Sequence, residues 1–380
     1  MKEISQTCNR SVTVRAAEGG TLNGSLVIAA ERVCSRTTRE KTEMKRYLGV
    51  DLHRTQFTVC TRLENGRTYL RQWPMRELKL FAGQLRKEDE IAVEATGNTR
   101  LFHDAVVEKV ARVVVVNPGQ FKVISQSVKK TDRNDAETLA LYLSKDLLPE
   151  VRMKERSQRE IAHLAQTRDL LVKQRSALKA KINNLLSAEG INLKRESLSS
   201  NKALDRVLAL PLPPILAAEA RVLVAQVRSL TGSIAELEEL LEEEGPRLAG
   251  HENLMSIKGI GPVSAAVLLS AIGNIEDFHE PGKLAAYLGL VPRIQNSNET
   301  ERSGHITKQG NKLARTALVQ CALVAKKYSP YLQQFYQRIQ RRRGGGKANI
   351  ALARKFLGVI YHTLKNNWVF EDFPNFVLAS

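Results

Sequence analysis

Short apolar runs alternate with segments of helical period between Arg46 and about Leu143. This mixture of period-2 and period-3.6 patterns predicts an α/β domain. The expected order is three strands, a helix, a strand, a helix, a buried strand and a helix, over Tyr47–Leu52, Phe57–Leu63, Thr68–Trp73, Glu77–Arg86, Ile91–Glu94, Leu101–Val110, Arg112–Val116 and Arg133–Leu143. Asn65-Gly66 predicts a hairpin turn between the second and third strands. A hairpin meander followed by alternating helices and parallel strands is the order of a ribonuclease-H-like fold.

The middle of the chain has the pattern of long helices. Apolar residues between Leu216 and Leu241 alternate spacings of four and three, which is a heptad seam. A similar seam runs from Ser157 to Ser187, and Pro211, Pro213 and Pro214 break the chain between the two. We therefore expect an antiparallel coiled-coil arm that supports dimerisation; the alternative is a purely intramolecular hairpin.

The last region begins near Glu252 and is predicted to be α-helical. Its stretch from Leu254 to Gly273 resembles a helix-hairpin-helix motif with Gly259-Ile-Gly261 as the turn. Glycines at such a turn let backbone amides approach a phosphate closely. A short helix is expected over Leu284–Leu290.

These patterns divide the chain into four parts. The expected parts are a polar N-terminal extension, the α/β domain, the helical arm and the α-helical C-terminal domain with its basic tail, at residues 1–45, 46–150, 151–250 and 251–380. Because Met44 directly precedes the α/β pattern, it is an alternative start of the chain.

Charge and composition narrow the class of partner. The 380 residues carry a formal net charge of +18, and between Glu301 and Lys365 there are 14 Lys or Arg against one acid. Such a bias is typical of a nucleic-acid surface. Cys8, Cys34, Cys60 and Cys321 show no zinc-ligand spacing. Without an apolar run of about 18 residues, we expect a soluble, cytoplasmic protein.

Four acidic residues are the strongest candidate site. Asp51 and Glu94 end predicted strands that would be neighbours, and Asp132 and Asp135 share one face at the start of a predicted helix, where Asp132 is placed to cap it. Carboxylates about 4 Å apart repel by roughly 4 kcal/mol per pair at an effective dielectric near 20, so their clustering indicates bound cations. Oxygen ligands suit Mg²⁺ or Mn²⁺, and two such ions would activate a phosphodiester.

Several motifs together resemble a known family. They are Gly-Val-Asp51, Val-Glu94-Ala-Thr-Gly, Val-Asn117-Pro, Lys-Thr-Asp132-Arg-Asn-Asp135-Ala, Ile257–Pro262, Leu284–Arg293 and Gly304–Asn311. This order resembles insertion-sequence transposases that combine a DEDD, RuvC-like domain with a C-terminal serine transposase domain and are guided by a bridge RNA. Lys258 departs from the family, in which proline is frequent at that place, and this concerns only the geometry of the turn.

The resemblance implies a nucleophile that composition does not reveal. A serine follows the Gly-Leu-x-Pro-Arg segment in the family, and Ser297 takes that place here, with Ser303 as the competing candidate. The implied function is a DNA recombinase that cuts and rejoins strands through a metal-assisted covalent phosphoserine. Its implied partners are donor and target double-stranded DNA, a structured guide RNA and further copies of the chain in a dimer or tetramer. The implied setting is the nucleoid of a bacterial or archaeal cell.

Basic residues near both half-sites are candidate nucleic-acid contacts. They are Lys129, Lys130, Arg133, Lys258, Lys308, Lys312, Arg315, Arg341, Arg342 and Arg343. The arginine cluster is interleaved with Phe335 and Tyr336, a combination typical of RNA or single-strand binding.

Three other functions remain open at this point. A junction-resolving nuclease would use the same four acids but release hydrolysed ends. An actin-like ATPase also opens with a strand and an Asp, but no glycine-rich phosphate loop follows here. A nucleic-acid-binding structural protein would show no dependence on the acids.

Overall fold

The computed structural model describes residues 44–117, 121, 131–193, 198–297 and 300–378, with side chains of 294–303 outside the description. Its contacts divide the chain into two compact units, Met1–Met153 and Lys154–Ser380. Lys129 and Lys130 lie outside the described residues. Each unit is described by itself below.

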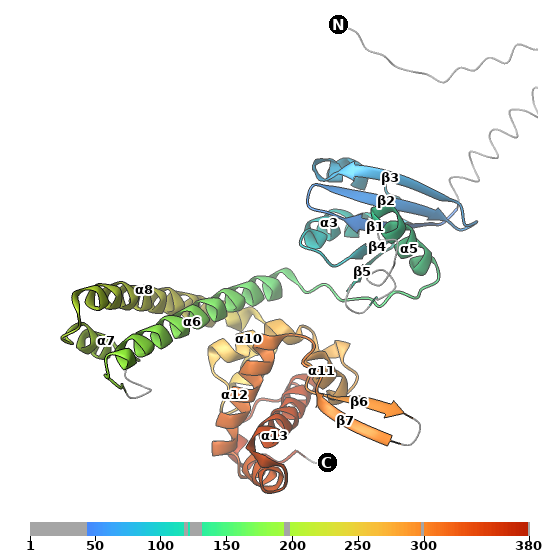
Figure 1. Ribbon diagram of the computed structural model, residues 1–380. Helices are drawn as coiled ribbons and strands as arrows, with labels where there is room; N and C mark the ends of the chain where they lie inside the picture. The colour runs from blue at the N-terminus through green and yellow to red at the C-terminus, as the bar shows by residue number, and fades with distance from the viewer. Residues whose placement is uncertain (1–43, 118–120, 122–130, 194–197, 298–299, 379–380) are drawn as a thin grey trace, which may run out of the picture. The chain divides into compact units, whose positions relative to one another are not determined.

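The first unit is built on a five-stranded mixed sheet (Figure 1). The strands are β1 Arg46–Leu52, β2 Gln56–Leu63, β3 Thr68–Pro74, β4 Glu90–Glu94 and β5 Arg112–Val116. Their order is β3-β2-β1-β4-β5, with β1, β2 and β3 antiparallel and β4 and β5 parallel to β1. The predicted hairpin turn is present, with Gly66 at a φ of 87°. This arrangement is consistent with the ribonuclease-H-like fold that the sequence predicts.

Alternation along β1 separates the two faces of the sheet. Leu48, Val50 and Leu52 join the core under the helices α2 Leu78–Ala82 and α3 Thr99–Val106. The opposite face is covered by α5 Asp132–Ser144, whose Leu139 packs in a second core with Ala92 of β4. Gly49 and Asp51 belong to this opposite face because they alternate with the buried apolar residues.

Helix α5 lies unusually close to β1. A Cβ on Gly49 would come within 2.1 Å of the Ala136 carbonyl oxygen and 2.4 Å of the Ala140 nitrogen. Ala136 and Ala140 also pack against Cys60 of β2. Small residues on both elements therefore let the helix backbone rest on the sheet and fix the height of its first turn.

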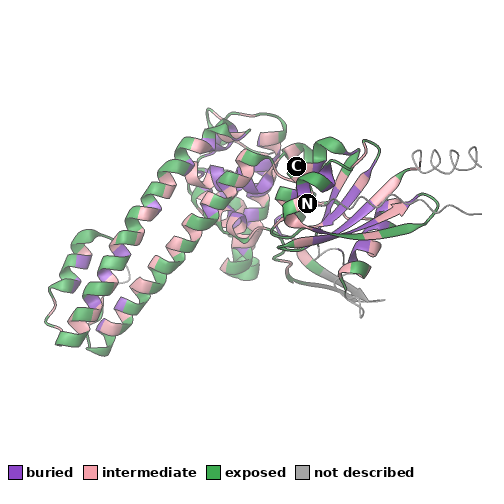
Figure 2. Ribbon diagram, turned by 90° about the horizontal axis from the view of Figure 1, so that it is seen from above, coloured by how far each residue is buried: buried purple, intermediate pink, exposed green. Residues whose placement is uncertain are grey.

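The second unit begins with two long helices joined through a short one. They are α6 Arg156–Ala188, α7 Asn201–Leu208 and α8 Pro214–Glu244. One row of the predicted heptad seam, made of Ala220, Val227, Ile234 and Leu241, is buried, whereas the alternate row is half-buried or less. The two long helices run side by side, and their buried residues face each other (Figures 1 and 2).

The remaining helices surround the large core of this unit. They are α9 His251–Met255, α10 Pro262–Ile272, α11 Pro281–Tyr287, α12 Lys312–Tyr328 and α13 Pro330–Lys365. Helix α10 is buried along most of its length, from Ala265 to Ile272. Helix α13 is kinked at Gly344, whose φ of 79° and ψ of 165° are not helical.

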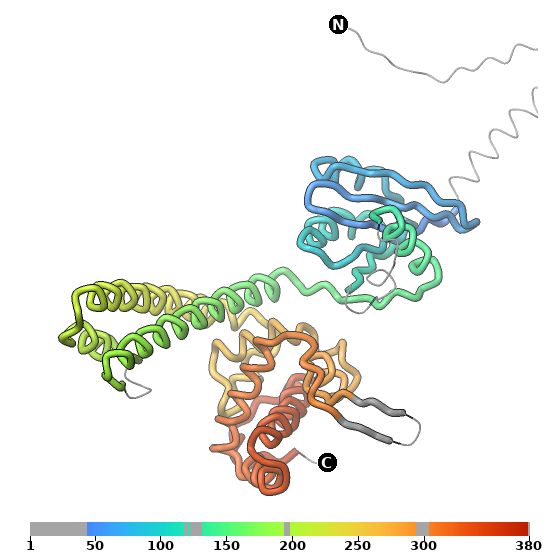
Figure 3. Tube along the Cα trace, in the orientation of Figure 1, coloured from blue at the N-terminus to red at the C-terminus, as the bar shows by residue number. Residues whose placement is uncertain are grey.

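A β-hairpin corrects the prediction of a purely α-helical C-terminal domain. Strands β6 Pro292–Ser297 and β7 Thr300–Ile306 pair antiparallel and leave the helical core together (Figure 1), and Figure 3 traces the helices of that core. The sequence analysis placed no strand in this segment, which has almost no apolar alternation. Backbone hydrogen bonds between β6 and β7 hold this hairpin together in place of buried apolar side chains.

None of the helices in the described ranges is both long enough and apolar enough to cross a membrane.

The close approach at Gly49 generates a stability prediction. Gly49→Ala is expected to lower the free energy of unfolding of the first unit by about 3 kcal/mol or more, because the new methyl group meets helix backbone that has no way to rotate aside. Gly83→Ala is the matched control, since a Cβ there meets nothing closer than 3.4 Å. Urea unfolding followed by circular dichroism measures both, and equal stability of Gly49→Ala and the wild type would contradict the prediction.

Candidate active site

Two of the predicted acids lie at the ends of neighbouring strands. Asp51 is the sixth residue of β1 and is only 5% exposed, and Glu94 is the last residue of β4. The parallel register pairs Val50 with Val93, so the next step along both strands brings Asp51 beside Glu94. Both follow the alternation that directs residues to the face covered by α5.

The other two acids lie in the first turn of α5. Thr131 caps this helix, with its hydroxyl accepting from the Asn134 amide at 3.3 Å. The prediction that Asp132 is the cap is therefore wrong. As the first helical residue, Asp132 directs its carboxylate away from the helix end and toward the sheet, whereas Asp135 is buried. The positive end of the helix dipole favours both negative charges.

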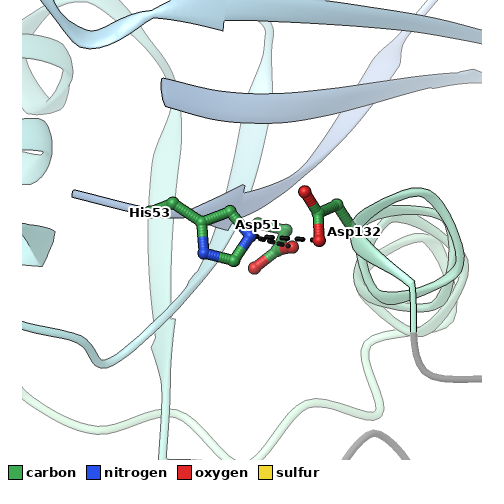
Figure 4. Close-up of side chains that lie close together, drawn as sticks. All are labelled: Asp51, His53 and Asp132. Atoms are coloured by element: carbon green, nitrogen blue, oxygen red, sulfur yellow. Dashed lines mark ion pairs between the residues drawn. The ribbon is translucent and has the colours of Figure 1, made fainter. Parts of the chain in front are cut away.

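His53 joins the acids of the two elements, as Figure 4 shows. Its Nε2 lies 3.2 Å from Oδ2 of Asp51 and 3.1 Å from Oδ1 of Asp132. Ligand atoms of these three residues all lie within 4.8 Å of one another, which is close enough to hold one metal ion. The sequence analysis did not select His53.

A signal for His53 was nevertheless present in the sequence. His53 is two residues beyond Asp51 at the end of a strand, and residues two apart on a strand lie on the same face. A lone histidine beside a turn is otherwise unremarkable, so this spacing gains meaning only once Asp51 is accepted as a site residue.

Hydrogen bonds fasten the two loops that border the site. The side-chain amide of Asn98 donates to the carbonyl oxygens of His53 at 3.0 Å and Arg54 at 3.2 Å. The Thr99 hydroxyl donates to the Glu94 carbonyl oxygen at 2.7 Å. The loop after β4 therefore holds the turn after β1, which fixes where the His53 backbone lies.

Electrostatics at Asp51 are unfavourable without a cation. Burial raises the pKa of the Asp51 carboxyl, and the charges of Asp132 and Asp135 raise it further, against the opposing effect of His53. For His53, burial lowers the pKa, but the carboxylates of Asp51 and Asp132 outweigh it and the net direction is upward. A divalent ion would relieve the repulsion between the carboxylates.

A shallow cavity of about 270 Å³ adjoins Asp132. Its lining includes Arg71 and Gln72 of β3 and Arg133 of α5. The Arg71 guanidinium lies 3.8 Å from the centre of the Trp73 ring, a cation–π contact that restricts its motion. Positive charge therefore stands beside the acids at a place open to solvent.

The predicted basic contacts within the described residues are mostly exposed. Arg133 is exposed and pairs with Glu137 at 3.1 Å. The exposed group otherwise consists of Lys258, Lys308, Lys312, Arg341, Arg342 and Arg343. Exposure leaves these side chains accessible to a phosphate backbone.

Arg315 has a structural role that its charge did not predict. Its Nη1 donates to the carbonyl oxygens of Leu288 at 3.0 Å, Gln309 at 2.8 Å and, more weakly, Gly310 at 3.4 Å. These carbonyls belong to the segments that enter and leave the β6–β7 hairpin. Arg315 therefore fastens the base of the hairpin.

Two aromatic residues near the arginine cluster contribute to packing. Tyr336 is 9% exposed, and the Lys326 ammonium lies 3.4 Å from its ring centre. Phe335 is partly buried against the core. Tyr336 in particular presents little ring surface for stacking on bases.

The predicted nucleophile lies at the far end of the hairpin. Ser297 is the last residue of β6 and pairs with Thr300, whereas Ser303 lies within β7 opposite Ile294. Their side chains lie outside the described residues. Ser297 and the four acids belong to different units of the chain.

Glycine at the predicted helix-hairpin-helix turn is required by packing. Gly259 has a φ of 113°, and a Cβ there would lie 2.6 Å from the Ala325 nitrogen of α12. Gly261, in contrast, meets nothing within 4 Å. The backbone at the start of α10 is therefore open to solvent at Gly261 and covered by α12 at Gly259.

Comparisons with known proteins match both units. Residues 48–189 match the family model of the IS110-type DEDD transposase, and residues 251–337 match the model described as "Transposase IS116/IS110/IS902 family". The transposase for insertion sequence element IS1111A of Coxiella burnetii is 27% identical over 89% of this chain and 95% of its own length. A probable family 20 transposase of Pseudomonas aeruginosa is 28% identical over 72% and 83%, respectively. The pilin gene-inverting protein of Moraxella bovis is 26% identical over 86% and 98%.

The raised pKa of Asp51 predicts that this residue costs stability in the absence of metal. A carboxyl whose pKa is higher in the folded than in the unfolded state loses stability as pH rises from its ordinary value of 3.8 through the folded value. Asp51→Asn is therefore expected to raise the Tm by roughly 2–5 °C at about pH 8 in chelator, and to change it little at about pH 4.

Differential scanning calorimetry across this pH range measures the effect. Asp104→Asn is the matched control, because its carboxylate is 52% exposed on α3. A lower Tm for Asp51→Asn at every pH would show that the Asp51 carboxylate stabilises the metal-free fold.

Proposed function

Because both units of the chain match models of IS110-type DNA transposases, we propose that it cuts and rejoins DNA strands of an insertion sequence through a covalent phosphoserine at Ser297. The observation that carries this proposal is the convergence of Asp51 and Asp132 from two elements of a DEDD domain, in a chain that also matches the family's C-terminal transposase model. The gene inversion named for the Moraxella bovis relative also requires strands to be cut and rejoined.

The donor set supports divalent metal use at the acids. A nearly buried Asp51 beside Asp132 and Asp135 carries repulsion that a divalent cation offsets. Carboxylate oxygens from these residues and from Glu94 are ligands that Mg²⁺ or Mn²⁺ prefers. When bound, such an ion polarises a phosphodiester and stabilises the attacking and leaving oxygens.

Serine chemistry would account for rejoining. The Ser297 Oγ would attack the scissile phosphorus, so that an Oγ–P bond forms as the P–O bond to the leaving nucleotide breaks. The serine hydroxyl loses its proton, and the departing oxygen gains one. One phosphodiester replaces another, so the reverse step onto a new strand end needs no external energy source.

Charge supports binding of DNA and a guide RNA. The exposed lysines and arginines of both units suit contacts to phosphate backbones, with base pairing between guide and DNA supplying sequence choice. Arg71 and Arg133 beside Asp132 would place one strand near the acids. In a dimer or tetramer, the serine of one copy would serve the acids of the same copy or of another.

A junction-resolving nuclease is the second candidate. One observation favours it: Asp51, His53 and Asp132 come together within the first unit alone. Hydrolysis at such a site would need no serine, and it would release free ends instead of a protein–DNA adduct.

Loss of an acid is expected to abolish strand cleavage. Asp132→Asn should lower the cleavage rate of insertion-sequence-end DNA by about 100-fold or more, as should chelation of divalent ions in the wild type, because charge stabilisation of the phosphoryl group is lost. Asp104→Asn is the control. Rates on radiolabelled DNA measure the effect, and undiminished cleavage by Asp132→Asn would argue against the acidic site.

Loss of the serine distinguishes recombinase from nuclease. Ser297→Ala should eliminate the covalent protein–DNA adduct on denaturing gels and strand exchange with it, while binding to the same DNA persists. Ser303→Ala is the matched variant and should retain the adduct. An adduct that survives in Ser297→Ala but disappears in Ser303→Ala would identify Ser303 as the nucleophile. Strand exchange by both variants would refute the serine mechanism.

A further inference from the structure

His53 places a nitrogen donor beside the two carboxylates that α5 and β1 bring together. One atom, Nε2, lies within 3.2 Å of both Asp51 and Asp132 (Figure 4). A side chain that only neutralised one acid would have no reason to face two acids from different elements with the same atom. This arrangement makes His53 a member of the cluster.

We propose that His53 Nε2 is a ligand of the divalent cation, together with Asp51 and Asp132. This inference rests on the proposed metal-dependent function and adds a nitrogen donor to its acidic residues. In an octahedral ion with bonds of about 2.1 Å, neighbouring ligand atoms at right angles lie about 3.0 Å apart. The separations of 3.2 and 3.1 Å from Nε2 match that spacing.

Hydrogen bonds fix the backbone of His53 in place. The His53 amide donates to the Gln56 carbonyl oxygen at 2.9 Å, and the His53 carbonyl accepts from Asn98 at 3.0 Å. Both ends of the residue are therefore held, and only its side-chain torsions remain to be set. Fixed ligands lose little conformational entropy when a cation binds.

Access also fits a metal ligand. The His53 side chain is 46% exposed and that of Asp132 is 44% exposed, whereas the Asp51 side chain is 7% exposed. A cation can thus reach the cluster from solvent without opening the fold, with Asp51 as the inner ligand. As a ligand, His53 would be neutral, with Nε2 toward the cation and its proton on Nδ1.

A nitrogen ligand has a consequence for metal choice. Carboxylates alone suit Mg²⁺, whereas imidazole favours transition metals, and Mn²⁺ accepts both kinds of donor. The site is therefore expected to bind Mn²⁺ more tightly than Mg²⁺, and this preference should shrink when His53 is replaced.

Electron spin-echo spectroscopy of Mn²⁺ bound to the full-length protein tests the assignment. The wild type should show coupling from a directly bonded ¹⁴N that changes to the ¹⁵N pattern when histidine is labelled. His53→Gln should lose this coupling and bind Mn²⁺ at least about tenfold more weakly. His103→Gln is the control, since His103 lies on α3 with its Nδ1 3.4 Å from Asp104.

The possible outcomes distinguish failure of the His53 ligand proposal from failure of the proposed metal-dependent function. Mn²⁺ that binds in the wild type and is lost in Asp51→Asn, but shows no nitrogen coupling, would overturn the role of His53 and leave the carboxylate site standing. A coupling that persists in His53→Gln would overturn it as well. Failure of the wild type to bind Mn²⁺ at all would overturn both proposals.

Discussion

The contact between helix α5 and strand β1 determines the geometry of the candidate site. Gly49 has no side chain, and Ala136 and Ala140 have the smallest ones, so two backbones meet directly. That contact sets the height of the first turn of α5 above the sheet. Asp132 and Asp135 are carried on this turn, and Asp51 follows Gly49 on the same face. A larger residue at any of the three packing positions would move two acids away from the third.

Most strand positions in the first unit were predictable because the strands are short apolar runs bounded by turns, as with Ile91–Glu94. The mostly exposed β3 was predictable because it follows the Asn65-Gly66 hairpin turn. The helix cap was not, because Thr131 and Asp132 are adjacent residues with similar capping preference. The β6–β7 hairpin was also missed, since Pro292–Ile306 is polar and carries no alternation. Its order comes from backbone pairing and from Arg315, and neither leaves a periodic pattern in the sequence.

The sequence located the acidic residues of the candidate site but not its nitrogen donor, His53. Strand order alone brings Asp51 beside Glu94, so these positions follow from topology. His53 depends on a turn whose shape is held by Asn98, a residue 45 positions away. Long-range hydrogen bonds of this kind have no signature in local sequence. The raised pKa of the buried Asp51 carboxyl shows the electrostatic cost of concentrating like charge at this site.

The hairpin base is held by main-chain groups. Arg315 binds carbonyl oxygens of Leu288, Gln309 and Gly310, and the Lys308 amide donates to the Gly289 carbonyl. Carbonyl oxygens are present whatever side chain a residue carries. Substitutions farther along β6 and β7 are therefore expected to leave the attachment of the hairpin to the helices intact, whatever they do to the chemistry proposed for Ser297. The position of the hairpin and the chemistry proposed for its far end therefore depend on different residues.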